Sequence, residues 1–446
     1  MPAVSPPPAA PAIHARLAAL GGPKAVTIQR PPWPWPNEAE IQAVLATLRK
    51  APEDIANLCS ARGGGPGEAL EARMKRDLGV PYAIATCGGG PALHIACMCA
   101  LEAGDEAIVS PYTWGQTVSC ILQAGGVPVF ADIDPETLTL DPDAVAARIT
   151  PRTKAIVAVH LGGIPAEMDR LAALAEKHGL CLIEDCAQAQ GSRYRGRSVG
   201  SFGHFGCFSF GSTKNIAAGD AGMLVTRDRG LYERALLTGM HPNRTTHEIE
   251  DPERRRWIDS LIYTYRVNVM SAALALAQFD RLEELNAWRR ANARALVERL
   301  RGVPGIRALR LPERLDPAWH SVHFVFVPEE VPGVTRSQYV QALSAEGVPI
   351  FTGYDSAIHL RPAFQEKRTH FGRGFPWSAH PRGGEIVYRA GDCPVAERRC
   401  GETGLTMLGG WSCRDIAPLL DQIGVAFRKV AAQLDQVARL DPAPAV

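Results

Sequence analysis

The chain has 446 residues, of which 46% are hydrophobic and 21% charged, so it is long enough for two domains with buried cores. Its 48 basic and 47 acidic side chains leave a formal net charge of +1, which excludes an overall field that would attract nucleic acid or an anionic membrane. No apolar run reaches the roughly 18 to 20 residues that span a bilayer. We therefore expect a soluble, enzyme-sized protein that binds any anionic ligand through a few local contacts rather than through its overall charge.

The N-terminal residues 1–20 are predicted to form a disordered tail, because the chain begins with a stretch rich in Pro and Ala. This stretch lacks the basic start and the apolar core of a signal peptide. The eleven cysteines are scattered without metal-ligand spacing, and the one close pair, Cys97 and Cys99, lies in an apolar helical run. We therefore predict reduced cysteines, no metal site and a cytoplasmic location.

The chain from residue 21 to residue 300 is predicted to be a large α/β domain. After a Trp/Pro segment at residues 31–36 and a glycine loop at residues 63–67, short β-branched runs alternate with amphipathic helical runs, as in parallel sheets with helical crossovers. A long helix is predicted over residues 271–301. The expected strands cover residues 107–110, 128–132, 155–160, 181–184, 207–210 and 223–226.

Residues 301–446 are predicted to form a smaller α+β domain. Strand patterns at residues 320–327 and 348–351 are followed by a helical pattern at residues 416–434. No internal repeat is apparent.

Asp185 follows the apolar residues 180–183, which places its carboxylate at the carboxyl end of a predicted buried strand. Open α/β sheets bind their ligands at that edge. Taken alone, such a carboxylate is most often a helix cap or part of a structural ion pair.

Residues 208–214 (FSFGSTK) lead from the next predicted strand into a loop that ends at Lys214. A lone lysine is by default a solvated surface charge. A lysine among apolar residues and beside an anionic cofactor can instead lose its proton and form an imine.

Gly88, Gly89 and Gly90 precede a predicted helix over residues 94–101, so their backbone N–H groups can face a phosphate. The run lacks the G-x-G-x-x-G spacing of a dinucleotide fold, which argues against NAD. Trp114 follows another predicted strand and suits either a core position or stacking on a flat ring.

An amine, a carboxylate and phosphate donors at successive strand ends are what pyridoxal 5'-phosphate (PLP) requires. Residues 184–191 (EDCAQAQG) and 207–215 (CFSFGSTKN) resemble the DegT/DnrJ/EryC1/StrS family of PLP-dependent sugar aminotransferases, which have fold type I. Residues 159–169 and 393–397 are also similar, and the resemblance extends from about residue 21 to the C-terminal helix.

The resemblance implies a role for each matching residue. Lys214 would carry PLP as a Schiff base and Asp185 would pair with the pyridine nitrogen. Gln188 would bond the ring hydroxyl, Ser209 would bind the phosphate, and Trp114 would replace the usual stacking Phe or Tyr.

Three departures from the family pattern affect the expected site. Gly89-Gly90 stands where Gly-Thr is usual, so backbone donors must hold the phosphate, with Ser212 or Thr213 able to compensate. Residues 219–222 (GDAG) replace Gly-Glu-Gly-Gly. Thr264-Tyr265-Arg266 replaces the Asn-Tyr-Arg that reaches the neighbouring subunit's phosphate, so Thr264 becomes a candidate cofactor contact in a homodimer.

The implied activity is a ping-pong transfer of an amino group from Gln or Glu to a keto sugar, a ketocyclitol or a related ketone of natural-product or antibiotic biosynthesis. The alternatives are an aromatising or dehydrating PLP enzyme on the same scaffold, or a non-catalytic PLP-binding regulator. Lys214 counts against dehydration, since family dehydratases replace this lysine. Loops at residues 239–250, around His359 and at residues 375–377 are expected to select the substrate.

Overall fold

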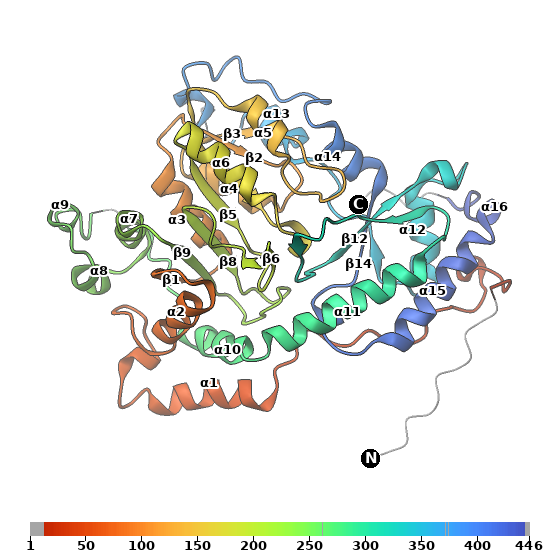
Figure 1. Ribbon diagram of the computed structural model, residues 1–446, viewed down its shortest axis with the longest axis horizontal. Coiled ribbons are helices and arrows are strands. Elements are labelled where there is room, and N and C mark those ends of the chain that lie inside the picture. Colours follow the sequence, from red (N-terminus) through yellow and green to blue (C-terminus); the bar gives the residue numbers. More distant parts are fainter. Residues whose placement is uncertain (1–12, 261, 371, 373, 442–446) are drawn as a thin grey trace.

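The computed structural model describes residues 13–260, 262–370, 372 and 374–441. A seven-stranded sheet forms the centre of the large domain, with strand order β1-β9-β8-β5-β4-β2-β3 (Figure 1). β9 is antiparallel to both of its neighbours, and all other neighbouring strands are parallel. The strands are β1 Tyr82–Thr86, β2 Glu106–Val109, β3 Val127–Phe130, β4 Thr153–Val159, β5 Cys181–Asp185, β8 Phe205–Ser209 and β9 Gly222–Thr226. The predicted α/β class is confirmed.

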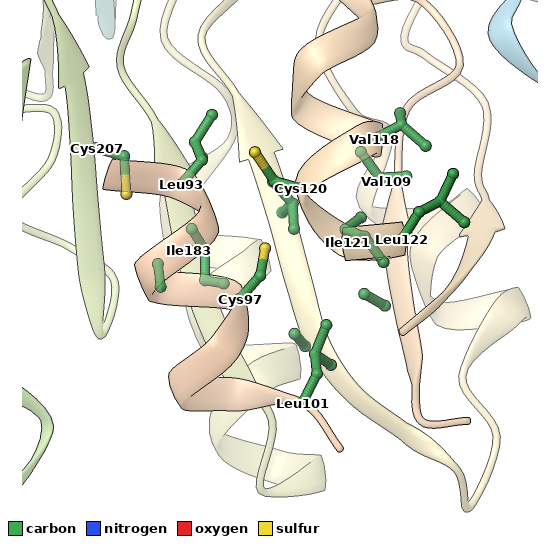
Figure 2. Packing of buried hydrophobic residues seen from close by; sticks show 14 of the residues in the cluster. Leu93, Cys97, Leu101, Val109, Val118, Cys120, Ile121, Leu122, Ile183 and Cys207 are labelled. Carbon is green, nitrogen blue, oxygen red and sulfur yellow. The ribbon is translucent and has the colours of Figure 1, made fainter. Parts of the chain in front are cut away.

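Helices cover both faces of this sheet, so the strands are apolar on both sides. In β4, Val157 packs in the core beneath α3 and α4, whereas Ile156 and Ala158 pack in the core beneath α6. Figure 2 shows α3 and α4 side by side over the sheet, with Cys97 and Cys120 between them. The helices of this domain are α1 Glu38–Lys50, α2 Gly65–Leu78, α3 Gly89–Ala100, α4 Gly115–Gln123, α5 Pro142–Arg148, α6 Met168–His178, α7 Arg229–Gly239, α8 Pro242–Glu248 and α9 Pro252–Arg255.

The single long helix predicted over residues 271–301 is wrong, because the structure has two helices there. α10 spans Val269–Phe279 and α11 spans Leu282–Leu300, which runs from the large domain into the small one (Figure 1). At the break, Asp280 pairs with Arg73 of α2 and Arg281 pairs with Glu40 of α1. These ion pairs join residues far apart in the sequence, so the helical periodicity of residues 271–301 could not predict the break.

The small domain is built on an antiparallel four-stranded sheet with strand order β10-β12-β14-β13. Figure 1 shows α12, α15 and α16 beside it. Its elements are β10 Ile306–Ala308, β12 Val322–Phe326, β13 Ile350–Phe351, β14 Gly404–Met407, α12 Arg336–Ala345, α15 Ala417–Ala431 and α16 Leu434–Val437. The chain also has a three-stranded sheet and two further short helices: β6 Arg193–Tyr194, β7 Arg197–Ser198, β11 Leu315–Asp316, α13 Pro362–Gln365 and α14 Pro394–Arg398.

The N-terminal boundary of the expected domains differs from the structure. Residues 1–12 of the predicted tail lie outside the described residues, but Leu17 is fully buried in the core of the small domain. The buried Glu346 carboxylate accepts N–H bonds from Ala18 and Ala25 and pairs with Lys429. A buried carboxylate requires such partners, so this segment belongs to the small domain rather than to a free tail.

The small-domain boundary differs as well, because part of residues 301–446 packs on the large domain. Ile358, Phe364 and Trp377 lie in the core formed by α3, α4 and the central sheet. Tyr388 donates a hydrogen bond to the Pro128 carbonyl of the edge strand β3, at 2.8 Å. This segment therefore covers the edge of the large sheet at β3.

Two further sequence expectations concern the cysteines and membrane spans. All eleven cysteines are free. Within the described ranges, no helix combines the length and the apolar character needed to cross a bilayer.

Candidate active site

The carboxyl ends of neighbouring parallel strands supply one pocket of about 290 Å³. β5 ends at Asp185 and the adjacent β8 ends at Ser209, so both residues reach the same edge of the sheet. The predicted site residues that line this pocket are Gly89, Gly90, Trp114, Asp185, Gln188, Ser209 and Lys214. Seven of the eight predicted residues are thus brought together, and we call this cavity the Lys214 pocket.

The Asp185 carboxylate is buried, with 4% exposure, and is held by two hydrogen bonds. Thr117 Oγ1 donates to Oδ2 at 2.8 Å, and the Ala187 backbone N–H donates to Oδ1 at 3.0 Å. Thr117 lies on α4, 68 residues away in sequence. The two donors fix the carboxylate in one orientation at the pocket wall, and sequence reasoning missed Thr117.

Gln188 is oriented by a backbone donor and a neighbouring phenol. Its Oε1 accepts the Gly162 N–H at 2.7 Å, which leaves Nε2 as the donor. Nε2–H donates to Tyr354 Oη at 3.4 Å. These two contacts fix the orientation of the amide at the pocket wall.

Lys214 is half-buried at the end of the loop that follows β8. Burial lowers the pKa of its amine, and the Asp185 carboxylate partly opposes this effect. A lowered amine pKa increases the uncharged, nucleophilic fraction at neutral pH. Trp33 Nε1–H donates to the Lys214 carbonyl at 3.1 Å, so the N-terminal segment also holds this loop.

The glycine run does not precede the helix as predicted but forms its first turn, since α3 begins at Gly89. A Cβ added to Gly89 would lie 2.6 Å from Ser209 Cβ. A Cβ added to Gly90 would overlap the Gln116 side-chain amide. Only glycine allows this helix terminus, with its free N–H groups, to approach Ser209 so closely.

Trp114 is 64% exposed, which excludes the core position that the sequence left open. It lines the Lys214 pocket immediately before α4. Its ring is therefore available to a ligand or to another subunit.

Thr264 is the one predicted site residue outside the Lys214 pocket of its own chain. It is exposed and has a φ of 55°. The next residues are anchored to β1: Cys87 N–H donates to the Tyr265 carbonyl, and Arg266 forms a bridge with Thr86. The loop thus presents Thr264 outward.

The model of the DegT/DnrJ/EryC1/StrS aminotransferase family matches residues 50–381. The chain belongs to this family. A UDP-N-acetyl-3-dehydro-alpha-D-glucosamine 3-aminotransferase from Acidithiobacillus ferrooxidans is 39% identical over 311 residues, 69% of this chain and 79% of that protein. An L-glutamine:2-deoxy-scyllo-inosose aminotransferase from Streptomyces kanamyceticus is 35% identical over 361 residues, 77% of this chain and 82% of that protein.

Among solved structures, an aminotransferase from Psychrobacter cryohalolentis superimposes with a TM-score of 0.77 at 30% identity, covering 91% of this chain and 100% of that one. The protein is a PLP-dependent aminotransferase with fold type I, as the sequence resemblance implied. The pocket suits this cofactor, because it combines a lysine of lowered pKa, a fixed carboxylate and a glycine-lined helix terminus.

The aminotransferase has a second, larger cavity of about 880 Å³, which shares Trp114 and Gln188 with the Lys214 pocket. Its walls come from the N-terminal residues 29–34, the loop after β8 and the small domain. We call it the side chamber. Ser212 and Thr213 line the side chamber and not the Lys214 pocket, so the expectation that they compensate at the phosphate is not supported by their positions.

The loops expected to select the substrate lie elsewhere. Within the described residues, none of residues 239–250, His359 or residues 375–377 lines either cavity. His359 is fully buried, and its Nε2 is 3.0 Å from a Glu397 carboxylate oxygen. Trp377 is buried and donates a hydrogen bond to Tyr388 Oη. Both residues stabilise the packing of this segment and do not contact a substrate cavity. Their place in predicted loops could not show this.

His160, Glu184 and Cys186 also lie close together, around the end of β5. The Glu184 carboxylate accepts backbone N–H bonds from Gly200, Phe202 and Gly203 at 2.7 Å each. It also lies 3.1 Å from His160 Nε2, and burial raises the pKa of the Cys186 thiol well above its usual value. The carboxylate oxygens are already used, so the cluster is a structural network.

Proposed function

We propose that this aminotransferase moves the amino group of an amino acid, glutamine or glutamate, to a neutral polyhydroxylated ketone, either a ketocyclitol or a keto sugar without a nucleotide. When bound, PLP would supply the imine chemistry by which an amino group passes from the donor to the ketone. Glutamine as donor is supported by the name of the Streptomyces kanamyceticus relative. The proposed acceptor is inferred from the residues that line the side chamber.

The proposed roles of the site residues follow the pocket geometry. Lys214 would bind the cofactor covalently and, once released, its uncharged amine would accept a proton from the donor α-carbon. Asp185 keeps the pyridine nitrogen protonated. Gln188 bonds the ring hydroxyl and Trp114 stacks on the ring, which its exposure allows.

The phosphate is proposed to lie where α3 begins. Gly89 and Gly90 offer the free N–H groups of a helix N-terminus, and Ser209 adds a hydroxyl from the facing wall. The three residues line one end of the Lys214 pocket.

The side chamber is almost free of charge. Among its described lining residues, Arg30 is the only one with a full charge. Burial lowers the pKa of His323 to about 3, and the pKa of His320 well below its usual value, so both imidazoles are neutral at physiological pH. A nucleoside diphosphate normally requires several cationic or charge-assisted partners. The chamber therefore favours an acceptor without phosphate.

The side chamber also contains neutral groups that can form hydrogen bonds with the hydroxyl groups of a substrate. His320 Nδ1 is buried without a hydrogen-bond partner in the described part of the chain, and the buried Tyr112 hydroxyl lies beside Arg399. A buried polar atom without a partner costs free energy until a ligand satisfies it. Trp33 and Trp411 supply apolar walls. This combination of aromatic surface and neutral polar atoms suits a polyhydroxylated ring.

A pair of half-reactions tests the proposal. The PLP form is mixed with L-glutamine, L-glutamate or L-alanine, and conversion to the pyridoxamine form is followed by absorbance. The pyridoxamine form is then mixed separately with an inosose and with a UDP-linked 3-keto sugar. We expect glutamine or glutamate to convert the enzyme, and the inosose to react with a kcat/KM about 100-fold higher than the nucleotide-linked ketone.

The two parts of the proposal fail in different ways. An enzyme that no amino acid converts to the pyridoxamine form is not an aminotransferase for these donors. An enzyme that converts but then prefers the nucleotide-linked ketone keeps the activity and loses the neutral acceptor.

We also propose that the enzyme is a cytoplasmic homodimer in which the Thr264 loop completes the neighbouring site. The outward position of Thr264 and the exposed rings of Trp114 and Tyr263 support this arrangement. Light scattering is expected to give twice the chain mass. Mixing a Lys214→Ala variant with a Thr264→Ala/Arg266→Ala variant should restore activity, because the mixed dimer contains one intact site. A fully active monomer would contradict the shared site.

A further inference from the structure

Gln116 contacts a position, residue 90, at which this sequence differs from the usual family pattern. The sequence has Gly90 where the family usually has threonine, which removes a hydroxyl donor from the phosphate end of the pocket. In the structure, a Cβ at position 90 would overlap the Gln116 amide nitrogen and lie 2.8 Å from its Oε1. The amide therefore occupies the space that a side chain at residue 90 would fill.

The packing of α3 against α4 maintains this placement. Cys120, one helical turn after Gln116, donates its S–H to the Gly90 carbonyl at 3.3 Å. Residues four apart lie on the same face of a helix, so this contact keeps Gln116 over the first turn of α3. Figure 2 shows the two helices side by side, with Cys120 on the side of α4 that faces α3.

The Gln116 amide is available to a ligand. Its side chain makes no hydrogen bond to any other described residue, and it lines the Lys214 pocket together with Gly89, Gly90 and Ser209. The same pocket contains the Asp220 carboxylate, while Lys214 is the only described Lys or Arg that lines it. A phosphate bound here needs neutral donors from this chain.

We propose that Gln116 Nε2–H binds the PLP phosphate and replaces the threonine hydroxyl that Gly90 lacks. This inference rests on the phosphate position given under the proposed function. Gly90 and Gln116 then form a complementary pair: the glycine makes room, and the longer side chain from α4 delivers the donor. A hydrogen bond between a neutral donor and a charged acceptor is stronger than one between two neutral groups.

The test measures the dissociation constant of PLP by titrating the apo-protein and following cofactor absorbance. Gln116→Ala is expected to weaken PLP binding by about tenfold. Gln116→Glu should weaken it further, because it places a carboxylate beside the phosphate. The double variant Gly90→Thr/Gln116→Ala should recover most of the loss, since the threonine then has both the space and the hydroxyl. Pyridoxal, which lacks the phosphate, should bind all four proteins alike.

The outcomes separate this inference from the proposed function. If the unaltered protein does not bind PLP, the proposed site fails. If it binds PLP but Gln116→Ala binds equally well, or if pyridoxal binding falls by the same factor, Gln116 does not contact the phosphate. A Gln116→Ala variant that changes only the KM of the ketone would likewise overturn the inference and assign the amide to the acceptor.

Discussion

Replacing Lys214 with alanine is expected to abolish covalent attachment of PLP and to lower kcat by about 10³-fold or more. The amine is both the proposed anchor of the cofactor and the proposed carrier of the donor proton, so both functions are lost together. Burial lowers the Lys214 pKa, and the uncharged amine is therefore present at lower pH than for an exposed lysine. Capture of PLP by the apo-protein should rise with pH through a midpoint below that of an exposed lysine.

Borohydride reduction followed by peptide mass analysis measures the attachment directly. The phosphopyridoxyl group should appear on the peptide that contains Lys214 and be absent from the Lys214→Ala protein. Lys214→Arg should also be inactive, because a guanidinium keeps the charge but does not lose its proton. Lys154→Ala, at an exposed position of β4, is the matched control and should behave as the unaltered enzyme. A Lys214→Ala protein that kept the absorbance of covalently bound PLP would refute the assignment.

Asp185→Asn is expected to lower kcat by about 10²- to 10³-fold while PLP remains attached to Lys214. Asparagine has nearly the same shape but no negative charge, so it cannot hold a proton on the pyridine nitrogen by charge pairing. One of the oxygens that accept from Thr117 and Ala187 becomes an NH₂ group, which adds a smaller structural cost.

Thr117→Val separates the charge of Asp185 from its orientation. It removes one hydrogen bond to the carboxylate and keeps the charge, so its kcat should fall by only about tenfold. Steady-state kinetics and thermal unfolding of the two variants measure these effects. An Asp185→Asn enzyme with kcat within about threefold of the unaltered enzyme would contradict the proposed role of the carboxylate.

The residues that could be predicted from sequence share one property: short chain segments determine their positions. Asp185 and Ser209 end apolar strands, and parallel strands place their carboxyl ends at one edge of a sheet. Gln188 and Lys214 follow within a few residues, so their entry into the same pocket required only that the two strands be neighbours. The family resemblance then implied a chemical role for each of these residues.

The residues that sequence reasoning missed or misplaced depend on contacts between distant segments. Thr117 reaches Asp185 from 68 residues away, and Trp33 holds the Lys214 loop from 181 residues away. His359 was expected in a loop near the substrate, but it is buried against Glu397. Neither periodicity nor motif spacing records such contacts.

The sequence by itself determined the α/β class, the cofactor and the strand-end residues around Lys214, because local hydrophobic patterns and short motifs encode them. Only the tertiary structure decided that α4 brings Gln116 over Gly90, and that the N-terminal segment and the small domain enclose a nearly uncharged chamber beside the lysine. These features arise from the packing of elements far apart in the chain, and packing depends on shape and partners that no single segment contains.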